Sequence, residues 1–302
     1  MRERALSVST PVGDLRALVH YPDADGPLPG VVLPGVVLVD GGGDSVADGW
    51  GDQPATFGGC GAVTLTHDKP GCGGSPGHWE DQSLQDRARD SLAALELLRR
   101  QPGVDPDRLG FLGISQGGWV SYIAASQAPR AVSQVVTISG PGVTGVEQER
   151  YRIGRDVDGD EEALGWVDER ARRILAGEAP ASILASQQAY ADRPWYGPVS
   201  DHYTLESIPF FTRAAAFDPA SVLPDVRCPV FAAFGGADTS VPVRRSVAVL
   251  NDLLPADPRH SITVFSNADH GLMPAGCDRT LPYGERIAPG FLDMLTAWFA
   301  AG

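Results

Sequence analysis

The stretch LGFLGISQGGW, residues 109–119, decides the fold that we expect for this 302-residue chain. Residues 109–114 form an apolar run typical of a strand, and residues 116–126 have the pattern of a helix. Between them, Ser115 is the centre of a Gly-X-Ser-X-Gly motif. Such a motif turns sharply from strand to helix and exposes the serine oxygen, and its glycines leave room for the neighbouring strand and helix. The motif predicts that Ser115 is a nucleophile at the carboxyl end of a central strand.

A second Gly-X-Ser-X-Gly match surrounds Ser75, but its setting differs. Pro76 and Gly77 follow directly, so the chain continues as a loop and no helix begins there. A nucleophile of this type needs a strand before the serine and a helix after it. We therefore predict that Ser75 belongs to an ordinary turn.

Strands and helices alternate along most of the chain. A leading hairpin is predicted from residues 6–9 and 15–20, which flank a Gly-Asp turn. This alternation is typical of an α/β fold with a mostly parallel central sheet that is flanked by helices. The further strands are predicted at 36–39, 62–66, 109–114, 132–138, 230–234 and 262–265, and the helices at 83–100, 116–126, 242–254 and 291–300.

Residues 145–216 interrupt the alternation. They contain helical patterns such as 163–175 and no strong strand run. We predict a core of residues 1–144 and 217–302, with a helical cap insertion at 145–216 over one edge of the sheet. The aromatic residues of the insertion either form a lid and pocket wall or only pack it onto the core, and both readings stay open. These residues are Trp166, Tyr190, Trp195, Tyr196, Tyr203, Phe210 and Phe211.

A serine hydroxyl becomes a useful nucleophile only with a nearby base, and that base needs an acid to orient it. In this architecture the chain order is serine, acid, histidine. Asp238 follows the strand 230–234 in a glycine-rich turn, so it is predicted to lie at the carboxyl edge of the sheet as the acid. Asp218 and Asp225 are fallback candidates, although each precedes a segment that contains proline.

The base is predicted to be His270, which follows the last strand at the same edge. The other histidines fit less well. His67 and His78 precede Ser115 in the chain, and His202 lies in the insertion. Two more, His20 and His260, are expected at the surface or at an edge because they lie at or beside strands.

An acyl-transfer reaction develops a negative oxygen that needs two N–H donors. One is predicted to be the amide of Gln116, directly after the nucleophile. The other should come from the glycine loop after the strand 36–39. We favour Gly42, with Gly41 and Gly43 left open, because bare backbone can approach a substrate closely there.

Composition limits the partners and the location. The chain carries 24 Lys+Arg against 38 Asp+Glu, a net charge of −14, which disfavours nucleic acid and membrane surfaces as partners.

The four cysteines form no metal-binding pattern, and free thiols are expected, with a Cys60–Cys72 bridge left open. The first residues lack an apolar signal core, so we expect a cytoplasmic protein. No metal or organic cofactor is expected, and a homodimer is left open.

Four motifs give the chain a resemblance to α/β-hydrolases of the serine esterase and acyl-peptidase type. They are HDKPGCGGS (67–75), SQGGW (115–119), SGPGV (139–143) and GAD (236–238). More narrowly, the chain resembles cap-bearing bacterial hydrolases that are dienelactone-hydrolase-like, acyl-aminoacyl-peptidase-like or bile-acid-acyltransferase-like. The resemblance implies the α/β-hydrolase fold and a Ser115–Asp238–His270 triad.

The sequence departs from this family pattern at two places. Ile114 stands where such proteins often have histidine, which makes the pocket floor more apolar. The loop DGGGD at 40–44 replaces a more usual Gly-Ser-Gly-Pro type of oxyanion loop.

These features lead to a functional hypothesis. We expect a hydrolase that cleaves a small or medium hydrophobic carboxylic ester through an acyl-enzyme, with macrolides and other lactones among the candidate substrates. The alternatives are an acyltransferase or cyclase, or a thioesterase, in which the leaving group or the accepting nucleophile differs. A non-catalytic ligand binder that uses the same cleft is the alternative from another class.

Overall fold

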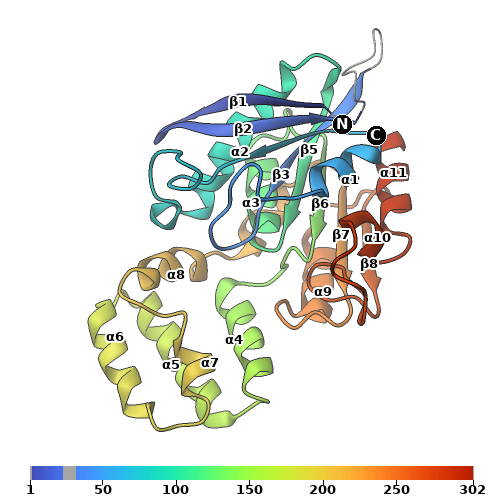
Figure 1. The fold of residues 1–302 in the computed structure, drawn as a ribbon. Coiled ribbons are helices and arrows are strands. Elements are labelled where there is room, and N and C mark those ends of the chain that lie inside the picture. Colours follow the sequence, from blue (N-terminus) through green and yellow to red (C-terminus); the bar gives the residue numbers. More distant parts are fainter. Residues whose placement is uncertain (1, 23–31, 302) are drawn as a thin grey trace.

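One mixed sheet forms the centre of this computed structural model, which describes residues 2–22 and 32–301. Within these residues the sheet has eight strands in the order β1-β2-β4-β3-β5-β6-β7-β8 (Figure 1). The pairs β1–β2 and β2–β4 are antiparallel, and all the others are parallel. The strands are β1 (Arg2–Thr10), β2 (Gly13–Tyr21), β3 (Leu33–Val39), β4 (Val63–His67), β5 (Val104–Ile114), β6 (Gln134–Ile138), β7 (Val230–Gly235) and β8 (Ser261–Phe265).

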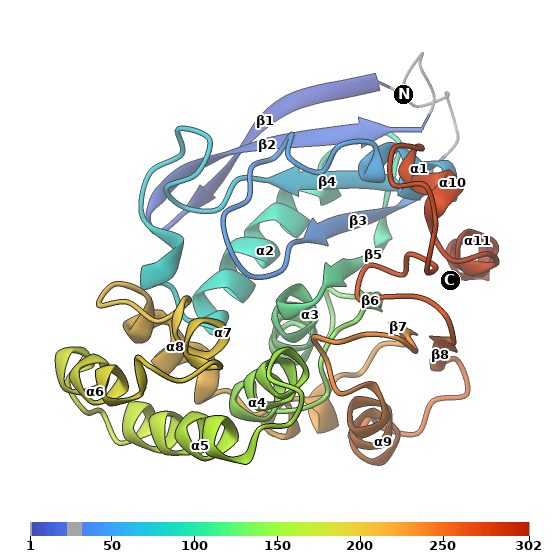
Figure 2. The same cartoon turned by 60° about the horizontal axis from the view of Figure 1, so that its bottom comes forward.

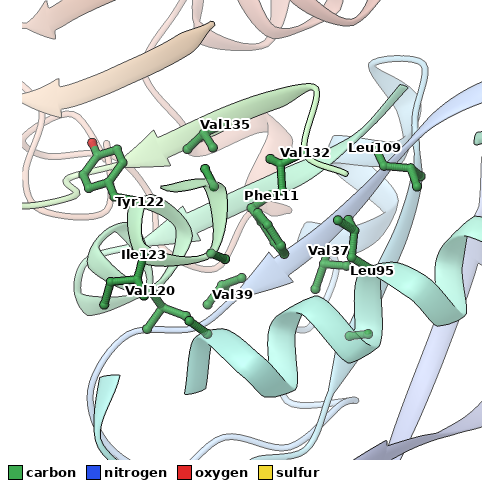
Figure 3. Close-up of a cluster of buried hydrophobic side chains, with 14 of the residues drawn as sticks. Val37, Val39, Leu95, Leu109, Phe111, Val120, Tyr122, Ile123, Val132 and Val135 are labelled. Carbon is green, nitrogen blue, oxygen red and sulfur yellow. The ribbon is translucent and has the colours of Figure 1, made fainter. Parts of the chain in front are cut away.

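Helices cover both faces of the sheet, which confirms the predicted α/β fold. On one face lie α2 (Leu84–Arg99), α3 (Gln116–Gln127) and α9 (Val243–Leu253), and on the other α1 (Gln53–Gly59), α10 (Tyr283–Arg286) and α11 (Phe291–Ala301). Figure 3 shows part of the first face, where apolar side chains of α2 and α3 meet those of β3, β5 and β6. The two apolar layers bury both sides of the parallel strands, as such sheets require.

Helix α2 shows how the sequence sets an element's start. Ser83 Oγ accepts a hydrogen bond from the Asp86 N–H (3.1 Å), and the Asp86 carboxylate accepts one from the Ser83 N–H (2.9 Å). This capping box satisfies two backbone donors at the helix terminus. The buried residues then recur at three- and four-residue steps: Leu84, Ala88, Ser91, Leu95 and Leu98.

Five helices lie between β6 and β7, in the stretch 145–216 that we call the cap. They are α4 (Gly145–Asp156), α5 (Glu161–Leu175), α6 (Pro180–Gln187), α7 (Tyr196–Ser200) and α8 (Ser207–Ala215). Figures 1 and 2 show them gathered on the side of the sheet where β6 leads into α4. All residues of this stretch are described, and it contains no strand, in agreement with the sequence pattern.

Two general expectations can be compared with the fold. All four cysteines are free thiols, so Cys60 and Cys72 form no bridge. Within residues 2–22 and 32–301, no helix combines the length and the apolar character that crossing a bilayer would need.

Candidate active site

Ser115 occupies a strained turn between β5 and α3. Its backbone has φ 54° and ψ −121°, a conformation that residues with a side chain rarely adopt, and its N–H donates to Ile138 O at 2.9 Å. A β-carbon added to Gly113 would lie 2.3 Å from Gly117 O, and one added to Gly117 would lie 2.1 Å from Val39 O. The glycines are therefore required by the close approach of backbone, as the motif predicts.

The structure brings Asp238 and His270 together at the carboxyl ends of β7 and β8. His270 Nδ1 lies 2.8 Å from Asp238 Oδ2. The other carboxylate oxygen, Oδ1, accepts hydrogen bonds from the N–H groups of Ser240 (2.7 Å) and Val241 (3.0 Å). Asp238 is 3% exposed, so its carboxylate is held in one orientation toward the imidazole.

Ser115 and His270 belong to the same edge of the sheet but are not hydrogen-bonded to each other. Strands β5, β6, β7 and β8 are parallel neighbours, so their carboxyl ends, which carry Ser115, Asp238 and His270, lie in a row. Among the residues that the structure describes, no hydrogen bond joins Ser115 Oγ to His270. Catalytic hydrogen bonds are often long in the free enzyme and shorten when substrate binds.

The glycine loop after β3 packs against Ser115. A β-carbon added to Gly41 would lie 3.4 Å from Ser115 Cβ, whereas one added to Gly42 would meet nothing within 4 Å. The loop and Gln116 thus flank Ser115 from two directions. Gly41 is the glycine packed most closely on Ser115, and Gly42 borders open space.

A buried group of charges behind this loop was not anticipated from the sequence. The Asp40 carboxylate forms ion pairs with Lys69 (3.0 Å) and Arg87 (2.8 Å), and the side chains of these two cations are 3% and 4% exposed. For each of these two cations, the sequence contains one feature that could have drawn attention to it. Lys69 is the only lysine in the sequence, and Arg87 lies on the apolar side of α2, three residues after Leu84.

The other serine and acid candidates have structural roles. Ser75 Oγ donates to Asp68 Oδ2 (2.8 Å) and accepts from the Arg16 N–H (2.9 Å), so it fixes a loop to β2. Asp218 accepts from the Ala220 N–H at 2.9 Å, and Asp225 pairs with an exposed arginine. None of these hydrogen bonds, nor the ion pair of Asp225, involves Asp238 or His270.

One histidine expectation was wrong. His20 was expected at the surface or an edge, but it is 4% exposed on β2, which pairs on both sides with β1 and β4. Its Nε2 lies 3.1 Å from Thr66 Oγ1, and burial lowers its pKa although Glu3 acts in the opposite direction.

His260 is half-buried and accepts from the Val230 N–H at 3.0 Å. His78 and His202 are exposed, and His67 Nδ1 lies beside Asp68 O.

A cavity of about 120 Å³ lies between the start of α3 and the cap. Gln116 and Trp119 line it from the core side, and apolar cap residues such as Ile174, Phe210 and Phe211 line it from the other. Four polar residues of the cap also border it: Gln148, Glu149, Arg170 and Tyr203. Because Gln116 follows Ser115 directly in the chain, the cavity lies next to Ser115.

The aromatic residues of the cap divide into two sets. Inside the cap, the ring of Tyr190 packs against those of Trp166 and Trp195, with ring centroids 5.2 Å apart in both pairs. Phe210 and Phe211 border the cavity, and Phe210 also contacts Trp79 of the core at 4.9 Å between centroids. At the opposite end, the Tyr151 hydroxyl on α4 donates to Asp238 O at 3.0 Å. The cap therefore contacts both the glycine-loop side and the acid side of the site.

Known proteins with related sequence or structure agree with this fold. A family model described as "Alpha/beta hydrolase family" matches residues 31–281. No curated protein sequence matches the chain. Similar solved structures include 2,6-dihydroxy-pseudo-oxynicotine hydrolase, at 21% identity and a TM-score of 0.62 over 99% of this chain and 68% of that one.

Two peptidases are also similar in structure. A puromycin-hydrolyzing peptidase of Mycobacterium tuberculosis has 20% identity and a TM-score of 0.62 over 99% of this chain and 39% of that one. An acylaminoacyl peptidase of Pyrococcus horikoshii has 17% identity and a TM-score of 0.54 over 89% of this chain and 38% of that one. The chain spans less than half the length of either peptidase, and at these identities the likeness concerns the fold alone.

Proposed function

The chain belongs to the alpha/beta hydrolase family, and from this premise we propose that it is a serine hydrolase that cleaves a small, hydrophobic carboxylic ester. The observation that carries the proposal is the 2.8 Å contact between Asp238 and His270 at the sheet edge where Ser115 occupies a strained turn. Nucleophile, acid and base follow one another along the chain in the order typical of this fold.

The proposed reaction proceeds through an acyl-enzyme. With Nδ1 hydrogen-bonded to Asp238, the Nε2 atom of His270 is free to accept the proton of Ser115 Oγ as this oxygen attacks the ester carbonyl. His270 then gives that proton to the departing alcohol. A water molecule, deprotonated by His270, attacks the acyl-enzyme, and return of the proton to Ser115 releases the acid.

The oxyanion of each tetrahedral intermediate would be bound by two backbone N–H groups. We assign these to Gln116, at the start of α3, and to Gly42 in the glycine loop. The positive end of the α3 dipole also points at this oxygen, since Gln116 is the first residue of the helix. Removal of one such donor typically reduces kcat by about 10²- to 10³-fold.

The cavity supports a hydrophobic acyl group. Apolar cap side chains form much of the wall of this space of about 120 Å³, and such a wall suits the hydrocarbon part of an ester. The aromatic residues Phe210 and Phe211 would then determine the length of acyl chain that is accepted.

A fluorophosphonate probe tests the nucleophile directly. The wild-type protein should be labelled covalently at neutral pH, and Ser115→Ala should not, because the reactive oxygen is removed. Ser75→Ala is the matched control, since it alters the second Gly-X-Ser-X-Gly match and should keep labelling. Labelling that persists in Ser115→Ala would contradict the assignment, and an unreactive wild type would favour a ligand binder.

Substrate assays then refine the proposal. Nitrophenyl esters of increasing acyl length, tested beside thioesters and lactones, should show the highest kcat/KM for short acyl esters. Added alcohols or amines would show whether the acyl group passes to water or to another acceptor. Faster turnover of thioesters than of matched esters would reject the ester assignment while keeping the nucleophile.

A further inference from the structure

We propose that Lys69 and Arg87 are positioning residues that hold both sides of the oxyanion hole and supply a buried positive charge behind it. This inference rests on the proposed function. The two cations share the carboxylate of Asp40, the residue that leads from β3 into the glycine loop. Neither cation reaches the solvent, so they do not act as ordinary surface charges.

The ammonium group of Lys69 lies among three oxygen atoms, which all belong to the glycine loop or to Asp40. Its Nζ donates to Gly41 O at 2.8 Å and to Gly43 O, and lies 3.0 Å from Asp40 Oδ2. An ammonium group has three protons on one atom, whereas a guanidinium spreads its donors over a wide plane. The chain uses arginine for every other basic side chain, so lysine here matches a requirement for a compact charge.

The bond to Gly41 O also sets the direction of the proposed oxyanion donor. The described residues contain no cis peptide bond, and in a trans peptide the carbonyl of one residue and the N–H of the next point in opposite directions. When Lys69 holds the carbonyl of Gly41, the N–H of Gly42 points away from Lys69. Gly42 also borders open space, which suits a group that must meet a substrate.

Arg87 connects this loop to the other donor. One terminal nitrogen donates to Asp40 O (2.9 Å) and to Asp40 Oδ1 (2.8 Å), and the second donates to the side-chain oxygen of Gln116. A single buried side chain on α2 thus contacts both segments that would bind the oxyanion. A displacement of about 1 Å in such groups can reduce a rate about 10²-fold.

The group carries one positive charge more than negative. Burial alone would raise the pKa of Asp40, but Arg87 and Lys69 together lower it, so this carboxylate is ionised. Burial, and then repulsion by Arg87, lower the pKa of Lys69 to about 8, while Asp40 acts against this shift. Lys69 also has the Cys72 thiol and the ring of Trp79 near it, and the Trp79 N–H donates to Asp44. His67 adds to the lowering of the pKa of Asp40. The excess charge would stabilise a developing oxyanion in this poorly solvated region.

Substitutions test the positioning role. Lys69→Met should lower kcat on a nitrophenyl ester about 10²-fold with KM changed less than about 3-fold, since the substrate itself does not contact this side chain. Arg87→Met should act similarly, and Lys69→Arg should recover part of the loss. Arg99→Met, at the far end of α2, is the matched control and should keep the wild-type kcat. Melting temperatures would separate a loss of folded protein from a loss of rate.

The pH dependence supplies a second test that needs no substitution. The single lysine gives one side-chain signal in protein labelled with ¹⁵N-lysine, so its titration can be followed directly by NMR. Because the charged form is present below the pKa, kcat should fall as the pH rises through about 8, in step with that signal. In Lys69→Arg the decline should move to higher pH, because arginine keeps its charge there.

The outcomes distinguish this inference from the proposed function. If wild-type protein does not react with a fluorophosphonate, the proposed function fails. If it reacts, but folded Lys69→Met labels and turns over at the wild-type rate, the inference fails and the function stands. A kcat that stays constant while the lysine signal titrates would overturn the role of the charge, whether or not any variant folds.

Discussion

The carboxyl edge of the sheet and the cap border the same site, but they are held together by different kinds of contact. At the edge, backbone meets backbone: an added β-carbon at Gly117 would lie 2.1 Å from Val39 O. In the cap, side-chain contacts are prominent, as where the ring of Tyr190 packs at a tilt against Trp166 and Trp195. Backbone contacts tolerate almost no change, whereas side-chain contacts can be exchanged one at a time. The difference suggests that the chemistry is fixed by the edge and the choice of substrate by the cap.

Asp238→Asn should have the largest effect of the changes that test this comparison. The asparagine keeps the shape but favours the wrong histidine tautomer, so kcat should fall about 10⁴-fold. Asp218→Asn is the control, because that carboxylate lies in a turn away from His270 and should keep its turnover. Steady-state assays with a nitrophenyl ester would measure both. Full turnover by Asp238→Asn would show that another acid orients the base.

A pair of glycine substitutions contrasts the two regions in stability. Gly117→Ala forces a β-carbon onto Val39 O and should destabilise the protein by about 3 kcal/mol. Gly165 is an exposed position of helix α5, where an added β-carbon would meet nothing within 4 Å, so Gly165→Ala should stabilise the cap by about 0.5–1 kcal/mol. Urea unfolding of both variants would measure the difference. Equal effects would mean that the edge is less tightly packed than its contacts indicate.

Of these substitutions, Phe211→Ala should have the smallest effect on activity, and that effect should depend on the length of the acyl chain. Its ring borders the cavity and stacks on Tyr203 at 4.5 Å, so its removal should shift preference toward longer acyl chains by about 10-fold in kcat/KM. Tyr190→Ala is the matched control, because that ring packs inside the cap and does not line the cavity. An unchanged chain-length profile in Phe211→Ala would place the acyl group elsewhere.

The parts of the molecule that could be predicted are those encoded locally. The turn at Ser115, the start of α2 at Ser83 and the strand before Asp238 each have a short pattern with a known physical cause. His20 was misplaced because a hairpin pattern does not reveal that β2 also pairs with β4. Strand order is a property of the whole sheet and is not written in one segment.

The charged group formed by Asp40, Lys69 and Arg87 is a part of the site that the sequence alone does not predict. Lys69 lies in the motif HDKPGCGGS, which indicates the family, and Arg87 lies in a helix with many charges. Only the folded chain brings these side chains to one carboxylate. The cap cavity is a similar case, since its walls come from α3, α4, α5 and α8. The sequence shows that residues 145–216 are rich in aromatic residues. It does not show which of their rings border the cavity.

The scarcity of lysine also affects how this protein can be handled. Apart from its amino terminus, the chain offers amine-directed dyes, cross-linkers and activated resins one target, and Lys69 is only 2% exposed. Such reagents should react poorly with the folded protein and readily once the chain opens. The rate of acylation at this position would therefore report how often the interior becomes exposed, without any engineered tag.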